Sequence, residues 1–220
     1  MFTPELAAGQ PVLDFLAPMA DDGVITYSID SALPLKKWVK KTFKKLDKSL
    51  DNVSFIKIDG DAELDFIRVD EIPSGNPRSL GLAQYRYQNN EPTVDLLINV
   101  DSITGAVVDG PKAGKYRKNY LRYVMLHELG HGLGLEHPFN ASDGDSLDTT
   151  GDFTVMAYNT GSAVFTDKKL KDFTEADIDT ISGIWNDTQT SNFSKAVTEN
   201  PLEKYDPKPK PFCFTCGRRH

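Results

Sequence analysis

Residues 127–137 read His-Glu-Leu-Gly-His-Gly-Leu-Gly-Leu-Glu-His, and this run holds three of the four histidines in the 220-residue chain. Because histidine is so scarce, the pattern HExxHxxGxxH would arise by chance with odds far below about one in ten thousand. His127 and His131 are four residues apart, so on a helix both imidazoles project from one face and can reach a single metal ion. The spacing therefore predicts a zinc site carried by a helix.

The other positions of the motif have separate tasks. Glu128 is rotated by about 100° from His127 around the helix axis, which suits a group that accepts a proton from water better than a metal ligand. His137 lies about 9 Å of helix rise beyond His131, so the helix must end before the third imidazole can reach the metal. Gly134 is predicted to end it, because glycine takes a left-handed backbone conformation without a steric penalty.

Three imidazoles and one acid predict a particular kind of zinc site. Three neutral imidazoles on Zn²⁺ leave a fourth position for water, whose pKa the metal lowers from about 16 to about 7. Catalysis needs such an open position, whereas a purely structural zinc site has none. The sequence therefore predicts Zn²⁺ as a catalytic cofactor and Glu128 as a general base.

A second segment, about 20 residues beyond the third histidine, reads Phe-Thr-Val-Met-Ala-Tyr at 153–158. Together with the zinc motif and Asp148-Thr149 it resembles the metzincin zinc endopeptidases, and within them it is most similar to serralysins. The resemblance implies that Met156 forms an apolar floor beneath the metal. It also implies that Tyr158 either ligates the metal or donates a hydrogen bond to a developing oxyanion.

Hydrophobic periodicity along the chain is consistent with this resemblance. Alternating residues predict strands at 24–29, 53–58, 65–69, 81–87 and 94–100. Helical spacing predicts helices at 35–50 and about 117–133, and a third that begins at Thr174 or Asp172 and carries Ile178, Ile181, Ile184 and Trp185. The resemblance then implies an α+β fold, α/β/α-like, with a twisted five-stranded mixed sheet, an active-site helix, a backing helix and a C-terminal helix after the methionine turn.

These elements divide the chain into three parts. Residues 1–21 are expected to be a lead-in and residues 191–220 an extended tail rich in proline and lysine that ends in CxxC, and the resemblance implies a metzincin-like zinc protease domain at residues 22–190. The chain contains 39% hydrophobic and 26% charged residues, and for this composition and length one soluble domain with a single core is expected.

The family resemblance also implies a strand that pairs with substrate along the rim of the cleft. The candidate segment is Gly81, Leu82, Ala83, Gln84 and Tyr85, because it directly precedes the last strand before the zinc helix. Strand addition draws affinity from the peptide backbone, so the expected substrate is extended polypeptide. The alternative is that the segment is an ordinary strand of the sheet.

Charge and hydropathy narrow the possible partners. Seven lysines lie on one side of the predicted helix 35–50, and they are interpreted as a solvated helix face rather than a site for an acidic partner or a membrane. A net charge of −7 argues against nucleic acid as a partner. The sequence shows no signal-sequence pattern and no apolar run of about 18 residues, so neither a secretory leader nor a membrane span is predicted.

The tail and one acidic loop leave alternatives open. Cys213, Cys216 and His220 could form part of a metal knuckle, a disulfide or a thiol ligand for the active-site zinc, although an unpaired or loosely disulfide-bonded end is favoured. Such a tail frays in isolation, so a protein partner is expected to hold residues 200–220, as in a virus particle or phage tail. The expected location is accordingly extracellular or virion-associated. The acidic loop, with Asp143, Asp145, Asp148 and Asp152, could hold Ca²⁺.

Two functions remain at this stage. The first is an active zinc endopeptidase, and the second is a structural or adaptor subunit on a metzincin scaffold whose zinc mainly stabilises the fold. Every chemical position of the motif is filled, Glu128 included, and this favours the enzyme.

Overall fold

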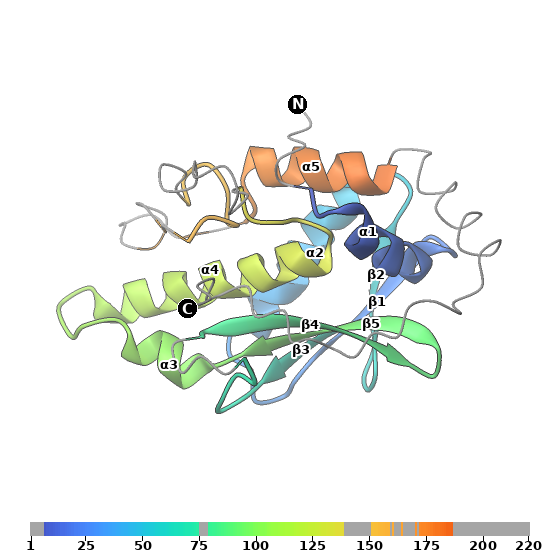
Figure 1. Ribbon diagram of the computed structural model, residues 1–220. Coiled ribbons are helices and arrows are strands. Elements are labelled where there is room, and N and C mark those ends of the chain that lie inside the picture. Colours follow the sequence, from blue (N-terminus) through green and yellow to red (C-terminus); the bar gives the residue numbers. More distant parts are fainter. Residues whose placement is uncertain are drawn as a thin grey trace, which may run out of the picture.

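A computed structural model describes residues 7–74, 79–138, 151–158, 160, 164, 170 and 172–186. Its centre is a five-stranded mixed sheet in the order β2-β1-β3-β5-β4 (Figure 1). The strands are β1 (Val24–Ile29), β2 (Ser54–Lys57), β3 (Leu64–Arg68), β4 (Gly81–Gln88) and β5 (Glu91–Ile98). Four strands pair in parallel, and β4 runs antiparallel to β5 at one edge. The predicted five-stranded mixed sheet is confirmed.

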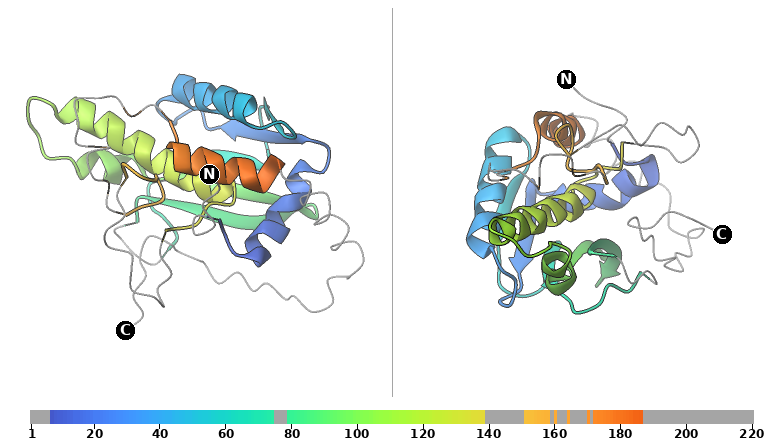
Figure 2. Two further views of the ribbon diagram at one scale, coloured as in Figure 1. Left: turned by 90° about the horizontal axis from the view of Figure 1, so that it is seen from above. Right: turned by 90° about the vertical axis from the view of Figure 1, so that its left-hand side faces the viewer.

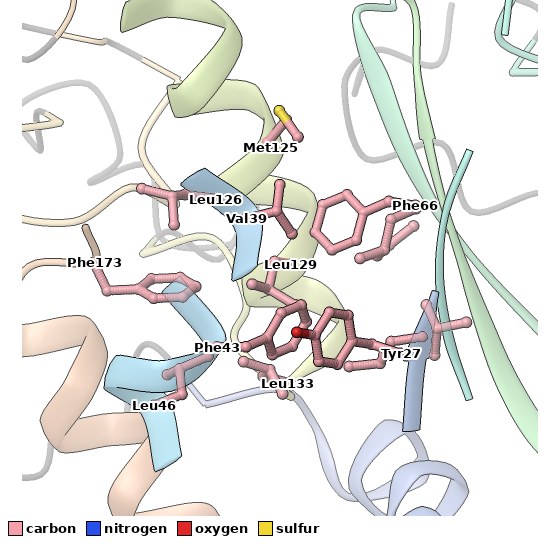
Figure 3. Packing of buried hydrophobic residues seen from close by; sticks show 14 of the residues in the cluster. Tyr27, Val39, Phe43, Leu46, Phe66, Met125, Leu126, Leu129, Leu133 and Phe173 are labelled. Atoms are coloured by element: carbon pink, nitrogen blue, oxygen red, sulfur yellow. The ribbon is translucent and has the colours of Figure 1, made fainter. Parts of the chain in front are cut away.

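Three longer helices lie on one side of this sheet. They are α2 (Lys36–Ser49), α4 (Ala113–Gly132) and α5 (Glu175–Asn186). Helices α2 and α4 lie against its face, and α5 lies beyond α4 (Figures 1 and 2). The core lies between them and the sheet, where Phe43 of α2 stacks on Tyr27 of β1 with ring centroids 3.8 Å apart (Figure 3). Leu126, Leu129 and Leu133 line the same core from α4 and its C-terminal end. The large apolar contact fixes α4, which carries the zinc motif, against the sheet.

Two short helices and a 3₁₀ turn were not predicted from the sequence. Helix α1 (Gln10–Leu16) and the 3₁₀ turn η2 (Ala17–Ala20) lie in the stretch interpreted as a lead-in. Helix α3 (Val100–Gly105) follows β5, so the predicted strand 94–100 is too long at its C-terminal end. The side chain of Asn99 accepts a hydrogen bond from the Ser102 amide at 2.9 Å, and this cap starts α3.

The zinc helix is also longer than predicted, since α4 begins at Ala113 and not near Arg117. None of the helices in the described residues is long and apolar enough to cross a membrane.

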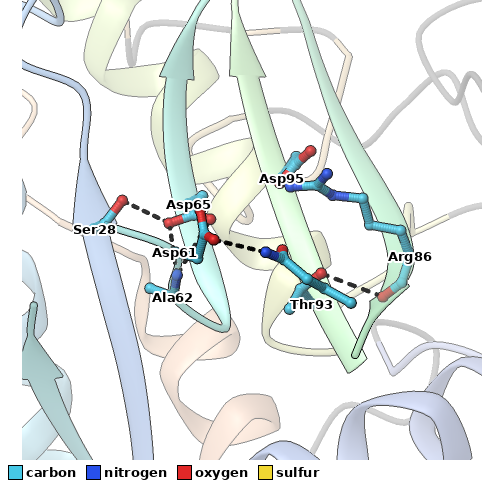
Figure 4. Close-up of polar contacts among 8 residues, drawn as sticks. Ser28, Asp61, Ala62, Asp65, Arg86, Thr93 and Asp95 are labelled. Atoms are coloured by element: carbon cyan, nitrogen blue, oxygen red, sulfur yellow. Dashed lines mark hydrogen bonds and ion pairs between the residues drawn. The ribbon is translucent and has the colours of Figure 1, made fainter. Parts of the chain in front are cut away.

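The sheet face away from α4 carries a polar network (Figure 4). Asp65 of β3 and Asp95 of β5 are register partners, and both alternate with residues that face the core. Asp65 accepts a hydrogen bond from the Ser28 hydroxyl at 2.5 Å, and Asp95 accepts one from the Arg86 guanidinium at 2.5 Å. Burial raises the pKa of both carboxyls above the ordinary value, against the opposing effect of these hydrogen bonds.

This raised pKa predicts how Asp65→Asn changes the pH dependence of stability. The native Asp65 carboxyl binds a proton more readily than the unfolded chain does, so its contribution is fully present below about pH 4 and is lost as the pH rises through the raised pKa. The variant lacks this loss, and its unfolding free energy should gain on that of the wild type as the pH rises above about 4.

Urea unfolding at several pH values measures the difference, with exposed Asp51→Asn as the control. Parallel pH profiles for Asp65→Asn and the wild type would contradict the raised pKa.

Candidate active site

The three predicted histidines converge at the end of α4. Nε2 of His127 lies 3.1 Å from Nε2 of His137, and one ligand atom from each of the three imidazoles lies within 4.8 Å of the others. The ring centroid of His131 is 5.0 Å from that of His127 and 4.7 Å from that of His137. All three side chains are buried. Within the described part of the chain, this is the group of His, Cys, Asp and Glu side chains that could hold a metal ion.

Hydrogen bonds at the opposite ring nitrogens orient two of the imidazoles. The Nδ1 atoms of His127 and His131 face the backbone carbonyls of Val155 (2.8 Å) and Leu135 (3.0 Å), which can only accept, so each of these Nδ1 atoms carries the proton and each Nε2 keeps its lone pair. The Nδ1 atom of His137 lies 3.0 Å from the Glu136 carboxylate. Such bonds orient histidine ligands in metal sites.

Burial keeps the three imidazoles neutral. It lowers the pKa of His127 to about 3, with a smaller contribution from His137, and it lowers the pKa of His137 itself to about 3. The pKa of His131 lies well below its usual value for the same reason. The Nε2 atoms of His127 and His137 lie 3.1 Å apart, close enough for one ion to bind both. The donor set therefore fits Zn²⁺, and three-histidine clusters of this kind are typical of zinc binding in metzincins.

A glycine turn ends α4 and brings the third histidine back. Gly134 has φ +87°, its amide donates to the His131 carbonyl at 3.0 Å, and the Leu135 amide donates to the Gly130 carbonyl at 2.8 Å. This pair of bonds is a Schellman motif, which satisfies the last carbonyls of a helix and reverses the chain. Because the left-handed conformation strains any residue with a Cβ, Gly134 suits this position.

Met156 lies directly beneath the zinc helix. It is fully buried, and a Cβ added to Gly130 would lie 2.5 Å from its sulfur. Its neighbour Val155 accepts the hydrogen bond from His127 described above. The methionine segment therefore contacts the zinc helix at Gly130 and one of the three histidines.

Asp177 of α5 holds this segment in place, and sequence reasoning did not predict that role. Its buried carboxylate accepts hydrogen bonds from the Thr154 hydroxyl at 2.5 Å and from the Val155 amide at 3.1 Å. It also accepts the Thr174 amide at 2.9 Å, which is the capping interaction predicted for the last helix. The capping pattern Thr-x-x-Asp was thus the available signal, but it did not reveal the contact across the fold.

Glu128 lies beside β4 and lines a pocket. Its side chain is buried and approaches Gly81 so closely that a Cβ there would lie 2.5 Å from its Oε1 atom and 2.8 Å from its Cδ atom. The pocket is lined by the carboxylate and by apolar and aromatic side chains: Leu80, Tyr120, Tyr123, Val124 and Tyr158. A proton acceptor therefore borders a concave space next to His127.

Tyr158 also faces this group. Its ring centroid is 4.4 Å from that of His137 and 6.0 Å from that of His127, and its side chain remains 44% exposed. An exposed phenol next to two ligands can reach either the metal position or a substrate oxygen.

Gly81→Ala is expected to reduce peptide hydrolysis by about tenfold or more and to lower stability, while zinc content stays unchanged. The added methyl would lie 2.5 Å from Oε1, 2.7 Å from Cγ and 2.8 Å from Cδ of Glu128, so this buried side chain must move from its position beside the pocket. Zinc content, urea unfolding and kcat/KM measure the three effects. Gly105→Ala is the matched control, because a Cβ there meets nothing within 4 Å. Unchanged kcat/KM in Gly81→Ala would show that the carboxylate needs no clearance.

Several predicted residues lie outside the described part of the chain. They are Asp143, Asp145 and Asp148 of the acidic loop, and Cys213, Cys216 and His220 of the tail. Asp152 is described and exposed.

Comparison with known proteins supports the predicted family resemblance of the segment that carries the zinc motif. A family model described as Met-zincin matches residues 110–163, about a quarter of the chain. Similar solved structures include archaemetzincin from Methanopyrus kandleri, at 14% identity and TM-score 0.43 over 74% of this chain and 97% of that one. Myroilysin is similar at 14% identity and TM-score 0.39, over 74% and 92%. No curated protein matches the chain. The segment that holds the zinc helix and Met156 thus matches the Met-zincin family, and it lies in an α+β fold with a five-stranded mixed sheet.

Proposed function

We propose that this protein is a zinc-dependent endopeptidase that hydrolyses peptide bonds of extended polypeptides. The observation that carries the proposal is the arrangement of three neutral, buried imidazoles beside the Glu128 carboxylate in one pocket. A metal site that only stabilises a fold has no use for an adjacent base that lines a cavity.

The chain's own residues would share the chemical work. Zinc, held by the Nε2 atoms of His127, His131 and His137, would polarise the scissile carbonyl and lower the pKa of water at the site to about 7. Glu128 would accept the proton of the attacking water and then return it to the departing amine. The Tyr158 hydroxyl would donate a hydrogen bond to the oxyanion of the tetrahedral intermediate, or ligate the metal before substrate arrives.

The outer edge of β4 supports an extended polypeptide as the substrate. Among the described strands β4 pairs with β5 alone and is therefore an edge strand of the sheet, and a peptide can add to an edge strand. Gly81 lies at the start of this strand and contacts Glu128. A peptide added along residues 81–85 would therefore pass beside the base.

Metal removal tests this function. A zinc chelator should abolish cleavage of an unstructured protein, and added Zn²⁺ should restore it in proportion to the zinc bound per chain. A chain that binds one zinc yet cleaves no unstructured polypeptide would favour the alternative, an adaptor subunit with a structural metal. Cleavage that persists after complete zinc removal would contradict both.

Two finer features belong to the same proposal. Met156 and Tyr158, two residues apart after the zinc motif, support a serralysin-like subtype. The proline-rich composition of the tail supports attachment to a larger assembly, such as a virus particle, through residues 200–220. Deletion of residues 191–220 should release the protein from such an assembly and leave peptide cleavage intact.

A further inference from the structure

Three aromatic rings gather at the far end of β4. Phe15 of α1 packs edge-on against Tyr85, with ring centroids 5.5 Å apart at 86°, and against Tyr87, with centroids 5.0 Å apart at 70°. We call Phe15, Tyr85 and Tyr87 the aromatic platform. Tyr87 remains 51% exposed, so about half of its surface can contact another molecule.

The platform is fixed to the metal site by hydrogen bonds. The Tyr85 hydroxyl donates to the carbonyl of His131 at 2.9 Å. The Ala8 amide, just before α1, donates to the carbonyl of Gly134 at 2.8 Å. Because these bonds attach β4 and α1 to the end of the zinc helix, the rings keep a set distance from the metal ligands.

The geometry of β4 connects the platform with the peptide that the proposed function requires. Gly81, Ala83, Tyr85 and Tyr87 point to one face of the strand, because side chains alternate along it. Tyr87 lies six residues beyond Gly81, which is about 20 Å along an extended strand. Antiparallel strand pairs outnumber parallel ones about two- to threefold, so we take the added peptide to run antiparallel to β4, from Tyr87 toward Gly81. With the scissile bond beside Glu128 near Gly81, the residues upstream of that bond would lie next to the platform.

We propose that the aromatic platform is a distal subsite that binds an apolar or aromatic side chain about four to six residues upstream of the scissile bond. This inference rests on the proposed function, since it assumes a peptide along β4. An aromatic ring on Tyr87 and Phe15 would exchange water for edge and face contacts, which favours Phe over Ser at these positions. Discrimination among substrates would then depend on residues far from the reacting bond.

Two peptides of equal length test the subsite. Both share one cleavable sequence and seven upstream residues, with Phe in one peptide and Ser in the other at positions four to six upstream. A third peptide keeps only two upstream residues. The wild type should cleave the Phe peptide with about tenfold higher kcat/KM than the other two, mainly through KM.

Tyr87→Ala should remove the advantage of the Phe peptide and leave cleavage of the short peptide unchanged. Ile56→Ala is the matched control, because Ile56 is 50% exposed on β2 at the opposite edge of the sheet, and it should keep the advantage. Equal kcat/KM for the Phe and Ser peptides in the wild type, or an advantage that survives in Tyr87→Ala, would overturn the subsite.

Binding separates the subsite from the proposed function. Fluorescence anisotropy of labelled peptides on zinc-loaded Glu128→Gln protein should show about tenfold tighter binding of the Phe peptide, and Tyr87→Ala in that background should abolish the difference. Peptide cleavage without any preference for Phe would refute the subsite alone. Phe-dependent binding without cleavage by the wild type would refute the peptidase activity and retain the subsite.

Discussion

Glu128→Gln is expected to lower kcat/KM for peptide hydrolysis by about 100- to 10,000-fold, which is the usual contribution of a general base. Glutamine keeps the length and nearly the volume of the side chain, so it fits beside Gly81 as glutamate does. It cannot accept the proton of the attacking water, however. The loss should therefore appear in kcat.

Zinc content distinguishes this effect from damage to the metal site. Glu128 is not one of the three candidate metal ligands, so the variant should still bind one zinc per chain. Exposed Glu175→Gln on α5 is the control and should retain wild-type kcat/KM. Near-normal hydrolysis by purified Glu128→Gln would assign the base to another group.

His131→Ala is expected to remove both zinc and activity. The two remaining imidazoles cannot hold zinc with the affinity of three, because each neutral ligand contributes directly to the binding free energy. The substitution also leaves the carbonyl of Leu135 without the ring that donates to it. Hydrolysis should fall to the background of the uncatalysed reaction.

Thermal unfolding with and without added zinc gives a second readout of the same change. A ligand that binds only the folded state stabilises it by about 4 kcal/mol when its free concentration is about 1,000 times its Kd. Added zinc should therefore raise the Tm of the wild type. It should leave the Tm of His131→Ala nearly unchanged. Exposed Glu175→Gln on α5 is again the control and should behave as the wild type. Full zinc content in His131→Ala would mean that other side chains hold the metal.

Local patterns in the sequence predicted the parts of the site that depend on one element. His127 and His131 meet because their spacing matches the helix period, and Gly134 reverses the chain because of its own backbone freedom. The alternation of apolar residues likewise gave five strands of the sheet. Each of these features is encoded within a few neighbouring residues.

Features that depend on contacts between distant segments were not predictable in this way. The sequence does not show that Gly81 makes room for Glu128, or that Asp177 binds the Val155 amide, since both contacts arise only after α4 and α5 pack on the sheet. Helix α3 is a different case, because the capping residue Asn99 was visible but the apolar run before it suggested a longer strand. The short α1 is held in place by tertiary bonds such as that from Ala8 to Gly134.

X-ray absorption at the zinc edge of the purified protein tests the central claim most directly. Three histidine ligands and one open position predict a first shell of nitrogen and oxygen alone, at about 2.0–2.1 Å, with the multiple scattering of three imidazoles. A sulfur shell at about 2.3 Å would place Cys213 or Cys216 on the metal, and a fourth imidazole would close the open position. Either result would contradict a hydrolytic zinc centre held by His127, His131 and His137.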